Sequence, residues 1–163
     1  MTRIDVLAPM SGSVVPIEEV PDPVFAERML GDGVAVDPVE GVGVAPVSGR
    51  LVVFHSAGHA FAVEEATTGV AVLVHVGLDT VEMHGEGFER LAEAGQDVRA
   101  GQEIVRFDLA AIEAAGHAAR SPIVLPQLEP SARVTVTGAD RVQAGRDVIL
   151  TVELPDGERA PGA

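Results

Sequence analysis

The chain has 163 residues, of which 47% are hydrophobic, and it contains no cysteine. This length suits one domain with its own core, and the lack of cysteine excludes a disulfide framework. The formal net charge is −14, with eleven arginines and no lysine. Such an acidic balance argues against a nucleic-acid surface, because phosphate backbones need clustered cations.

The sequence shows no sign of membrane insertion or secretion. No apolar run approaches the roughly 18 residues of a membrane span, and the first residues lack the apolar stretch of a signal peptide. We therefore expect a cytoplasmic protein with no direct membrane insertion. Glycine and proline are plentiful while aromatic residues make up only 3%, which favours a β domain with many turns over a helical bundle.

Short runs rich in Val, Ile and Leu recur between turn signals along the chain. Their spacing predicts an all-β fold, an antiparallel β-sandwich or squashed barrel with short helical turns. The expected strands are residues 4–8, 12–16, 33–37, 41–45, 49–54, 59–64, 70–76, 103–108, 121–124, 133–136 and 147–152.

Three brief helical segments are expected, over residues 24–30, 88–94 and 108–115. Asp22 followed by Pro23 supplies an N-cap and a first-turn proline for the first of them. A glycine follows the first and the third segment directly, as is typical at the end of a helix.

Two stretches of the sequence look alike. Residues 8–15 and 45–52 each begin with Ala-Pro-x-Ser-Gly and lead into an apolar strand. An internal duplication is one interpretation, although short turns of this kind also arise independently. We expect one domain over residues 1–154, followed by a flexible C-terminal tail over residues 155–163, where the chain becomes too polar to pack.

Two of the five histidines flank one predicted hairpin. The only turn signal between the strands that contain His59 and His75 is the segment 66–69. If the hairpin is centred on Thr67, His59 lies directly opposite His75. Opposed residues of an antiparallel pair have Cβ atoms about 5 Å apart, so the two imidazoles would form one site. A one-residue slip in register would instead place them on opposite faces.

Imidazole suits phosphoryl transfer. One ring nitrogen can attack while the other keeps a hydrogen bond that fixes the tautomer, and a pKa near 6.5 keeps the ring neutral in the cell. A second imidazole can then donate to the phosphoryl oxygens. Asp79 and Asp22 could repel a misplaced phosphate or contact a basic partner, although each is more simply a turn or cap residue.

The segments 59–61 and 73–88 resemble the enzyme IIA domain of the glucose, sucrose and N-acetylglucosamine branch of the bacterial sugar phosphotransferase system. The second is Leu-Val-His-Val-Gly-Leu-Asp-Thr-Val-Glu-Met-His-Gly-Glu-Gly-Phe, a long and specific match. Residues 20–33, 45–49 and 95–109 support it, so the resemblance covers roughly residues 4 to 153. It implies an antiparallel sandwich of the duplicated hybrid motif type.

The resemblance also implies roles for individual residues. His75 matches the histidine that takes a phosphoryl group from the phosphocarrier HPr and passes it to a cysteine of a IIB domain, and His59 matches the supporting histidine. Regulatory protein targets are further expected partners. An apolar ring around the site would dock these partners, and the matching residues are Phe25, Met29, Leu30, Phe61 and Leu73, with Asp22 beside them.

The chain departs from the family pattern in three places. Ala57 stands where the family usually has a threonine that contributes a hydroxyl to the active site, and Ser56 is the candidate replacement. The loop before His59 and the hairpin turn each look one residue longer than usual. The enteric members carry an N-terminal membrane-binding extension, whereas the first expected strand here starts at residue 4, so we expect no such anchoring.

The sequence offers three alternatives to a phosphoryl carrier. His59 and His75 could bind zinc, with Asp79 or His84 as third ligand, or with a carboxylate from a partner as in some family members; no cofactor is obligatory. A biotinyl or lipoyl carrier resembles the turns of this chain but needs a lysine, which the chain lacks. A regulatory binding module without catalysis is the third alternative, suggested by the missing hydroxyl at Ala57.

Overall fold

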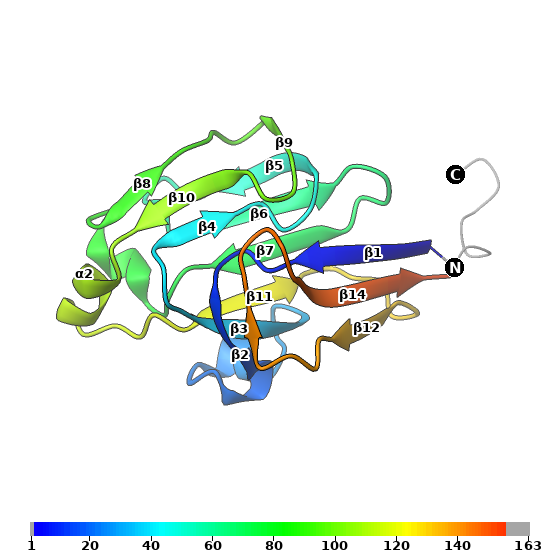
Figure 1. Ribbon diagram of the computed structural model, residues 1–163, viewed down its shortest axis with the longest axis horizontal. Coiled ribbons are helices and arrows are strands. Elements are labelled where there is room, and N and C mark those ends of the chain that lie inside the picture. The colour runs from blue at the N-terminus through cyan, green and yellow to red at the C-terminus, as the bar shows by residue number, and fades with distance from the viewer. Residues whose placement is uncertain (1, 156–163) are drawn as a thin grey trace.

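The structure is a computed structural model that describes residues 2–155, and its strands pair antiparallel throughout that range. One sheet has eight strands in the order β13-β2-β3-β11-β7-β6-β5-β9, and two smaller sheets have the orders β1-β14-β12 and β4-β10-β8 (Figure 1). The expected all-β sandwich is confirmed. The strands are β1 (Thr2–Leu7), β2 (Gly12–Pro16), β3 (Asp32–Pro38), β4 (Val42–Val44), β5 (Gly49–Phe54), β6 (Ala60–Glu65), β7 (Ala71–His75), β8 (Phe88–Arg90), β9 (Asp97–Val98), β10 (Glu103–Phe107), β11 (Ser121–Leu125), β12 (Arg133–Val136), β13 (Arg141–Val142) and β14 (Val148–Leu154).

The helical segments are short, and two of them begin where an aspartate caps them. Helix α1 (Pro23–Ala26) starts after Asp22, whose carboxylate accepts the Val24 N–H at 3.0 Å. It ends earlier than expected because Arg28 takes a left-handed conformation with φ 59°. Helix α2 (Leu109–Ala114) is capped in the same way by Asp108. Two 3₁₀ turns, η1 (Ile17–Glu19) and η2 (Thr80–Met83), complete the set.

The helix expected over residues 88–94 is wrong. Residues 88–90 form β8, which pairs with β10 through Phe88 opposite Phe107. The rings of these two residues stack with centres 6.4 Å apart. Pairing and packing against β10 thus outweigh the helix propensity of the Glu-Arg-Leu-Ala stretch, as tertiary context commonly does.

The two similar turns lie against each other. Leu7 N–H donates to the Pro46 carbonyl at 2.9 Å, and Val44 N–H donates to the Pro9 carbonyl at 2.7 Å, so each turn holds the other. The strand after each turn pairs with a two-residue strand, β2 with β13 and β5 with β9. The internal duplication stays a prediction.

Two apolar clusters lie on opposite faces of the large sheet. The main core fills the space between the three sheets and includes Phe61 and Ile123. Neighbouring residues such as Val124 point to the other face, because side chains alternate along a strand. There they form a smaller cluster beneath α1, made of Val15, Ile17, Val20, Phe25, Ala35, Leu78 and Val124.

Replacing Phe61 by alanine should strongly destabilise the protein. The side chain is fully buried, and its ring meets Phe54 edge-on with ring centres 5.9 Å apart. Truncation of a buried phenylalanine leaves a cavity and costs about 3–5 kcal/mol of unfolding free energy. Urea denaturation measures the loss. Val53→Ala, at an exposed position of β5, is the control and should cost about 0.5 kcal/mol or less.

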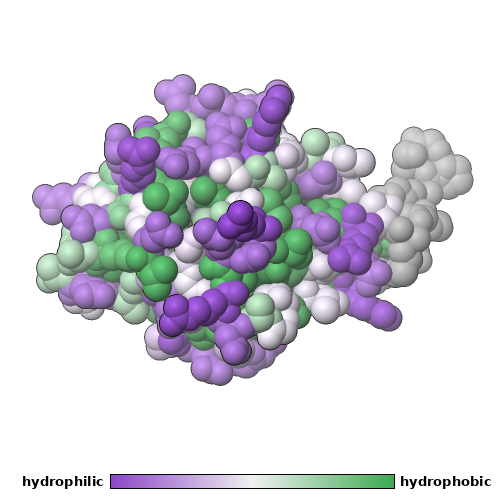
Figure 2. Space-filling model, viewed as in Figure 1, coloured by the Kyte–Doolittle hydropathy of each residue, from purple (hydrophilic) through white to green (hydrophobic). Residues whose placement is uncertain are grey.

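The outer surface reflects the acidic composition. Figure 2 shows hydrophilic side chains over much of one face, gathered most densely along the edge where β5, β8 and β9 lie in Figure 1. No helix within residues 2–155 is long and apolar enough to cross a lipid bilayer. The C-terminal tail expected over 155–163 lies, apart from Pro155, outside the described residues.

Candidate functional site

The hairpin between β6 and β7 brings His59 and His75 together in a register that differs from the expected one. His75 pairs with Ala60, one residue along from His59. The Glu65 N–H donates to the Val70 carbonyl at 2.8 Å, so the centre of the loop falls between Thr67 and Thr68. His59 therefore precedes β6, and strict alternation of faces does not apply to it. Its carbonyl still accepts the Val76 N–H at 2.7 Å.

The site is a group of three imidazoles with His59 in contact with the other two. The ring centres of His59 and His75 are 5.2 Å apart, and those of His55 and His59 are 4.3 Å apart. Phe25 packs against His75 with ring centres 5.4 Å apart, and Phe88 lies 6.5 Å from His59. His59 is buried, His75 is half-buried and His55 is exposed. Solvent therefore reaches His55 and part of His75 but hardly reaches His59.

The contacts of His75 define its tautomer. Its Nδ1 lies 2.7 Å from the carbonyl oxygen of Gly77. A carbonyl oxygen can only accept, so Nδ1 carries the hydrogen and donates it. Burial lowers the pKa of His75, while this hydrogen bond and the nearby carboxylates of Asp22 and Asp79 act in the opposite direction. The neutral ring therefore keeps a lone pair on Nε2, which is the nucleophilic form.

His59 is held neutral by its surroundings. Burial is the main cause that lowers its pKa to about 4, and the charges that His75 and His55 can carry add to the effect. Its Nδ1 is buried and has no hydrogen-bond partner within the described part of the chain. Because an orphaned buried N–H is rarer than an orphaned acceptor, the tautomer with hydrogen on Nε2 is favoured. The ring can then donate from Nε2.

The stability of the protein should fall as the pH is lowered from about 6.5 towards 4. The pKa of His59 is 6.5 without the fold and about 4 within it, so the unfolded chain binds more protons across this window. The His59 contribution is thus fully present above pH 6.5 and is lost on acidification. Urea denaturation at pH 7 and pH 5 measures the change.

Two variants isolate the His59 contribution from the titration of carboxylates. His59→Gln should show a smaller fall in unfolding free energy between pH 7 and pH 5 than the wild type. His84→Gln alters an exposed histidine that caps η2, and it should keep the wild-type fall. An unchanged pH dependence in His59→Gln would contradict the assignment.

The other polar candidates surround the histidines at different depths. Asp22 is half-buried at the start of α1, and Asp79 is exposed with a left-handed backbone, φ 58°. Both carboxylates are close enough to influence His75. Ser56 is exposed, and its hydroxyl does not reach the unpartnered Nδ1 of His59. Ala57 instead donates its N–H to Nδ1 of His55 at 3.0 Å.

The expected docking residues differ in exposure. Met29 is 69% and Leu30 39% exposed, so both present apolar surface to solvent. Leu73 is half-buried and packs against the small cluster beneath α1. Phe25 and Phe61 are buried, the first in that small cluster beside His75 and the second in the main core.

The two paired histidines are the candidate metal ligands of the site. Within residues 2–155, no group of three or more His, Cys, Asp or Glu side chains is arranged to hold one. His59 and His75 can supply two nitrogen atoms. A metal bound between them would therefore need a ligand from elsewhere.

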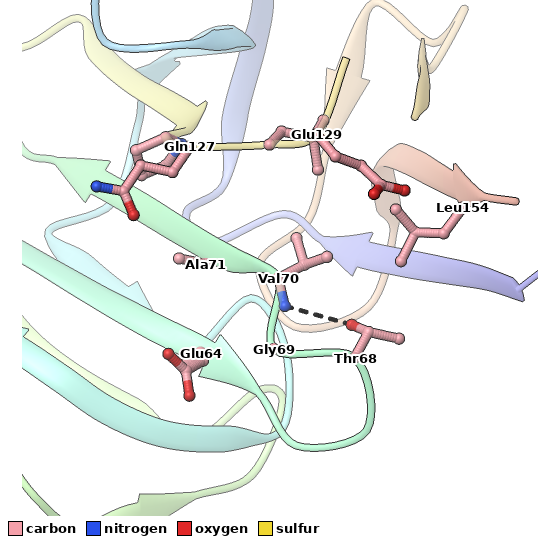
Figure 3. A pocket seen from close by; sticks show the side chains of 10 residues that line it. Glu64, Thr68, Gly69, Val70, Ala71, Gln127, Glu129 and Leu154 are labelled. Carbon is pink, nitrogen blue, oxygen red and sulfur yellow. Dashed lines mark hydrogen bonds between the residues drawn. The ribbon is translucent and has the colours of Figure 1, made fainter. Parts of the chain in front are cut away.

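A pocket lies at the opposite end of β7. It measures about 250 Å³ and contains no histidine. In Figure 3 the side chains of Glu64, Gln127 and Glu129 surround the start of β7 at Ala71. The four residue steps from Ala71 to His75 correspond to about 13 Å of strand, so this pocket is separate from the histidine site.

Sequence reasoning missed several residues around the histidines. The sequence analysis assigned no role to His55, although its position four residues before His59 is a usable signal. Two buried hydrogen bonds follow His75: Gly77 N–H donates to Ser121 Oγ, and the Thr80 hydroxyl donates to the Val76 carbonyl. The polarity of these residues alone does not distinguish them from ordinary turn residues.

Fold and site together define a class: an antiparallel β-sandwich that brings two imidazoles together at the end of a hairpin. A family model for the phosphoenolpyruvate-dependent sugar phosphotransferase system, EIIA 1, matches residues 4–130. The chain belongs to this family and is thus a component of a phosphotransferase system.

Individual relatives agree with this assignment. The glucose-specific EIIA component of Bacillus cereus is 42% identical over 149 residues, covering 91% of this chain and 90% of that protein. Its counterpart from Haemophilus influenzae is 41% identical over 151 residues, covering 93% and 90%. The solved structure of glucose permease IIA from Mycoplasma capricolum superposes with a TM-score of 0.86 at 37% identity, covering 93% of this chain and 96% of that one.

Proposed function

We propose that this chain carries a phosphoryl group on Nε2 of His75, taken from phospho-HPr and passed to a cysteine of a IIB domain. The observation that carries the proposal is the bond from His75 Nδ1 to the Gly77 carbonyl, which leaves Nε2 with its lone pair. Membership of the EIIA family and the second imidazole 5.2 Å away support it. The names of the relatives favour glucose as the sugar served.

The mechanism is an in-line displacement in each direction. The lone pair of His75 Nε2 attacks phosphorus while the bond between phosphorus and its donor atom on HPr breaks, and HPr keeps that electron pair. The IIB thiolate later attacks phosphorus, and the electrons of the phosphorus–nitrogen bond return to Nε2. Positioning and charge stabilisation supply most of the catalysis in such transfers.

His59 is placed to stabilise charge on the transferring group. Its Nε2 hydrogen can be donated to a phosphoryl oxygen on His75, because the two ring centres are only 5.2 Å apart. A phosphoryl group brings nearly two negative charges, which oppose the effect of burial on the pKa of His59. His59 can therefore take up a proton when the group arrives and strengthen the interaction.

Docking of both partners would use the apolar surface beside His75. Met29 and Leu30 are exposed and follow α1, whose Phe25 contacts the His75 ring. Asp22 and Asp79 add negative charge at the rim, which suits partners with basic residues around their own reactive groups. We place this exchange in the cytoplasm, where a carrier can meet HPr and the IIB domain in turn.

A weak zinc site completed by a partner is proposed on the same residues. His59 and His75 would supply two nitrogens, and a partner carboxylate would add a third ligand. Binding at Nε2 of His59 would move that hydrogen to the unpartnered Nδ1, a cost that keeps affinity low in the isolated chain. Zinc titration of the free chain should accordingly give weak binding.

The test of the carrier role is intact mass after incubation with phosphoenolpyruvate, enzyme I and HPr. The expected result is a gain of one phosphoryl group per chain, lost after an acid step because phosphohistidine is acid-labile. Addition of the cognate IIB domain should return the chain to its original mass. If the mass does not increase in the complete mixture, the proposal is overturned. A regulatory binding module without catalysis would then be the remaining function.

A further inference from the structure

The carbonyl that fixes the tautomer of His75 lies just beyond the end of a strand. β7 ends at His75, and Gly77 has φ +72°, a conformation that side chains rarely adopt. A Cβ added there would lie 2.6 Å from the Thr80 side chain and 2.9 Å from the Ala118 carbonyl. The direction in which the Gly77 carbonyl points therefore depends on the contacts of the loop that follows β7.

Both peptide groups around Gly77 are held by one segment, residues 118–121. Gly77 N–H donates to Ser121 Oγ at 3.0 Å, and Leu78 N–H donates to the Ala118 carbonyl at 2.9 Å. In the peptide between Gly77 and Leu78, the carbonyl oxygen thus accepts a hydrogen bond from His75 Nδ1, and the N–H donates one to the Ala118 carbonyl. Linked bonds of this kind polarise and strengthen one another.

Ser121 is a buried polar residue that contacts the Gly77 loop. It is the first residue of β11 and is fully buried, with 0% exposure. Its hydroxyl accepts from Gly77 and donates to the Ala119 carbonyl at 2.8 Å, so its hydrogen is directed away from the Gly77 loop. The contact with Gly77 joins residues 44 positions apart in the sequence.

The supporting segment is itself anchored from the far side. Arg120 donates to both carboxylate oxygens of Asp37, at 2.8 and 3.0 Å, and to the Glu19 carbonyl at 2.8 Å. A two-point arginine–carboxylate contact fixes orientation as well as distance. Residues 118–121 are thus tied to β3 and η1 while they hold the loop after β7.

We propose that Ser121 is a positioning residue for His75, acting through the Gly77 loop. By holding the Gly77 N–H, Ser121 fixes the residue whose carbonyl faces Nδ1, so the hydrogen stays on Nδ1 and the lone pair on Nε2. The proposal rests on the proposed role of His75 for its effect on transfer, but its effect on the tautomer is independent of that role.

The test uses Ser121→Ala and two readouts. The first is the pair of ¹⁵N chemical shifts of the His75 ring, recorded at pH 8 on the full chain without partners. The wild type should show one tautomer with hydrogen on Nδ1, and the variant should show shifts averaged towards the other tautomer. The second readout is phosphoryl transfer from phospho-HPr, whose kcat should fall about 10- to 100-fold with little change in KM for HPr.

Two further variants separate positioning from general stability. Ser121→Thr keeps the hydroxyl and should restore both the shifts and kcat. Ser11→Ala removes a hydroxyl that also accepts a backbone N–H, from Ala144 at 2.9 Å, far from the histidines in sequence. It should leave the His75 shifts and kcat at wild-type values even if it lowers thermal stability.

The outcomes are distinct. Wild-type ring shifts in Ser121→Ala would overturn the positioning role, whatever happens to stability. Failure of the wild type to accept a phosphoryl group would overturn the proposed function, while the ring shifts would still decide the role of Ser121. Altered shifts with unchanged kcat would show that the tautomer control does not serve transfer and would also overturn the proposal.

Discussion

Replacement of His75 by alanine is expected to abolish phosphoryl acceptance from phospho-HPr. The variant lacks the Nε2 lone pair that the Gly77 contact leaves free, and His59, the nearest imidazole, is buried with its pKa lowered to about 4. Intact mass after incubation with phosphoenolpyruvate, enzyme I and HPr gives the answer directly. The wild type should gain one acid-labile group, and His75→Ala should gain none.

The control for this result is His84→Ala, which removes another histidine from the same stretch of sequence. His84 is exposed at the end of η2, so the variant should be phosphorylated as the wild type is. A phosphoryl gain in His75→Ala would identify a different acceptor, and mapping of the modified residue would then replace His75 in the mechanism.

Replacement of His59 by glutamine should separate acceptance from onward transfer. The nucleophile and its bond to Gly77 are unchanged, so the variant should still take the phosphoryl group. Glutamine cannot become a cation, however, and loses the charge that His59 can gain beside the phosphoryl oxygens. Because a hydrogen bond from a charged donor is roughly twice as strong as one from a neutral donor, transfer to IIB should slow by about 10-fold or more.

The measurement starts from the phosphorylated His59→Gln variant, purified away from HPr and mixed with IIB in a single-turnover experiment. Loss of the phosphoryl group from this chain and its gain by IIB are followed together by mass. Wild-type transfer rates in this variant would rule out the supporting role of His59. A variant that cannot be phosphorylated at all would show that His59 already serves acceptance.

Much of the fold was predictable because its signals are local. Runs of β-branched residues between glycine and proline turns mark strands directly, and β2, β5 and β12 have the expected bounds. The hairpin register was wrong by one residue, since a four-residue loop and a three-residue loop look alike in sequence. The expected helix over residues 88–94 was wrong because pairing with β10 is a long-range effect.

The two central histidines of the candidate site were predictable from the sequence, whereas the residues that contact them were not. His59 and His75 stand at the two sides of one turn signal, and the structure brings their rings together. No local pattern links Ser121 to Gly77, which lie 44 positions apart and meet through a backbone N–H. The contact of His55 with His59 depends on the path of a strand-end loop, which composition does not specify.

The bond from His75 Nδ1 to a neutral carbonyl also determines the proton balance of a carrier of this kind. Since Nδ1 keeps its hydrogen throughout, a group that joins or leaves Nε2 requires no proton to enter or leave the ring. In the proposed transfer, the species that departs from phosphorus is a neutral imidazole, which is a far better leaving group than an imidazolate anion. The His75 ring itself therefore exchanges no proton with solvent in either direction of that transfer.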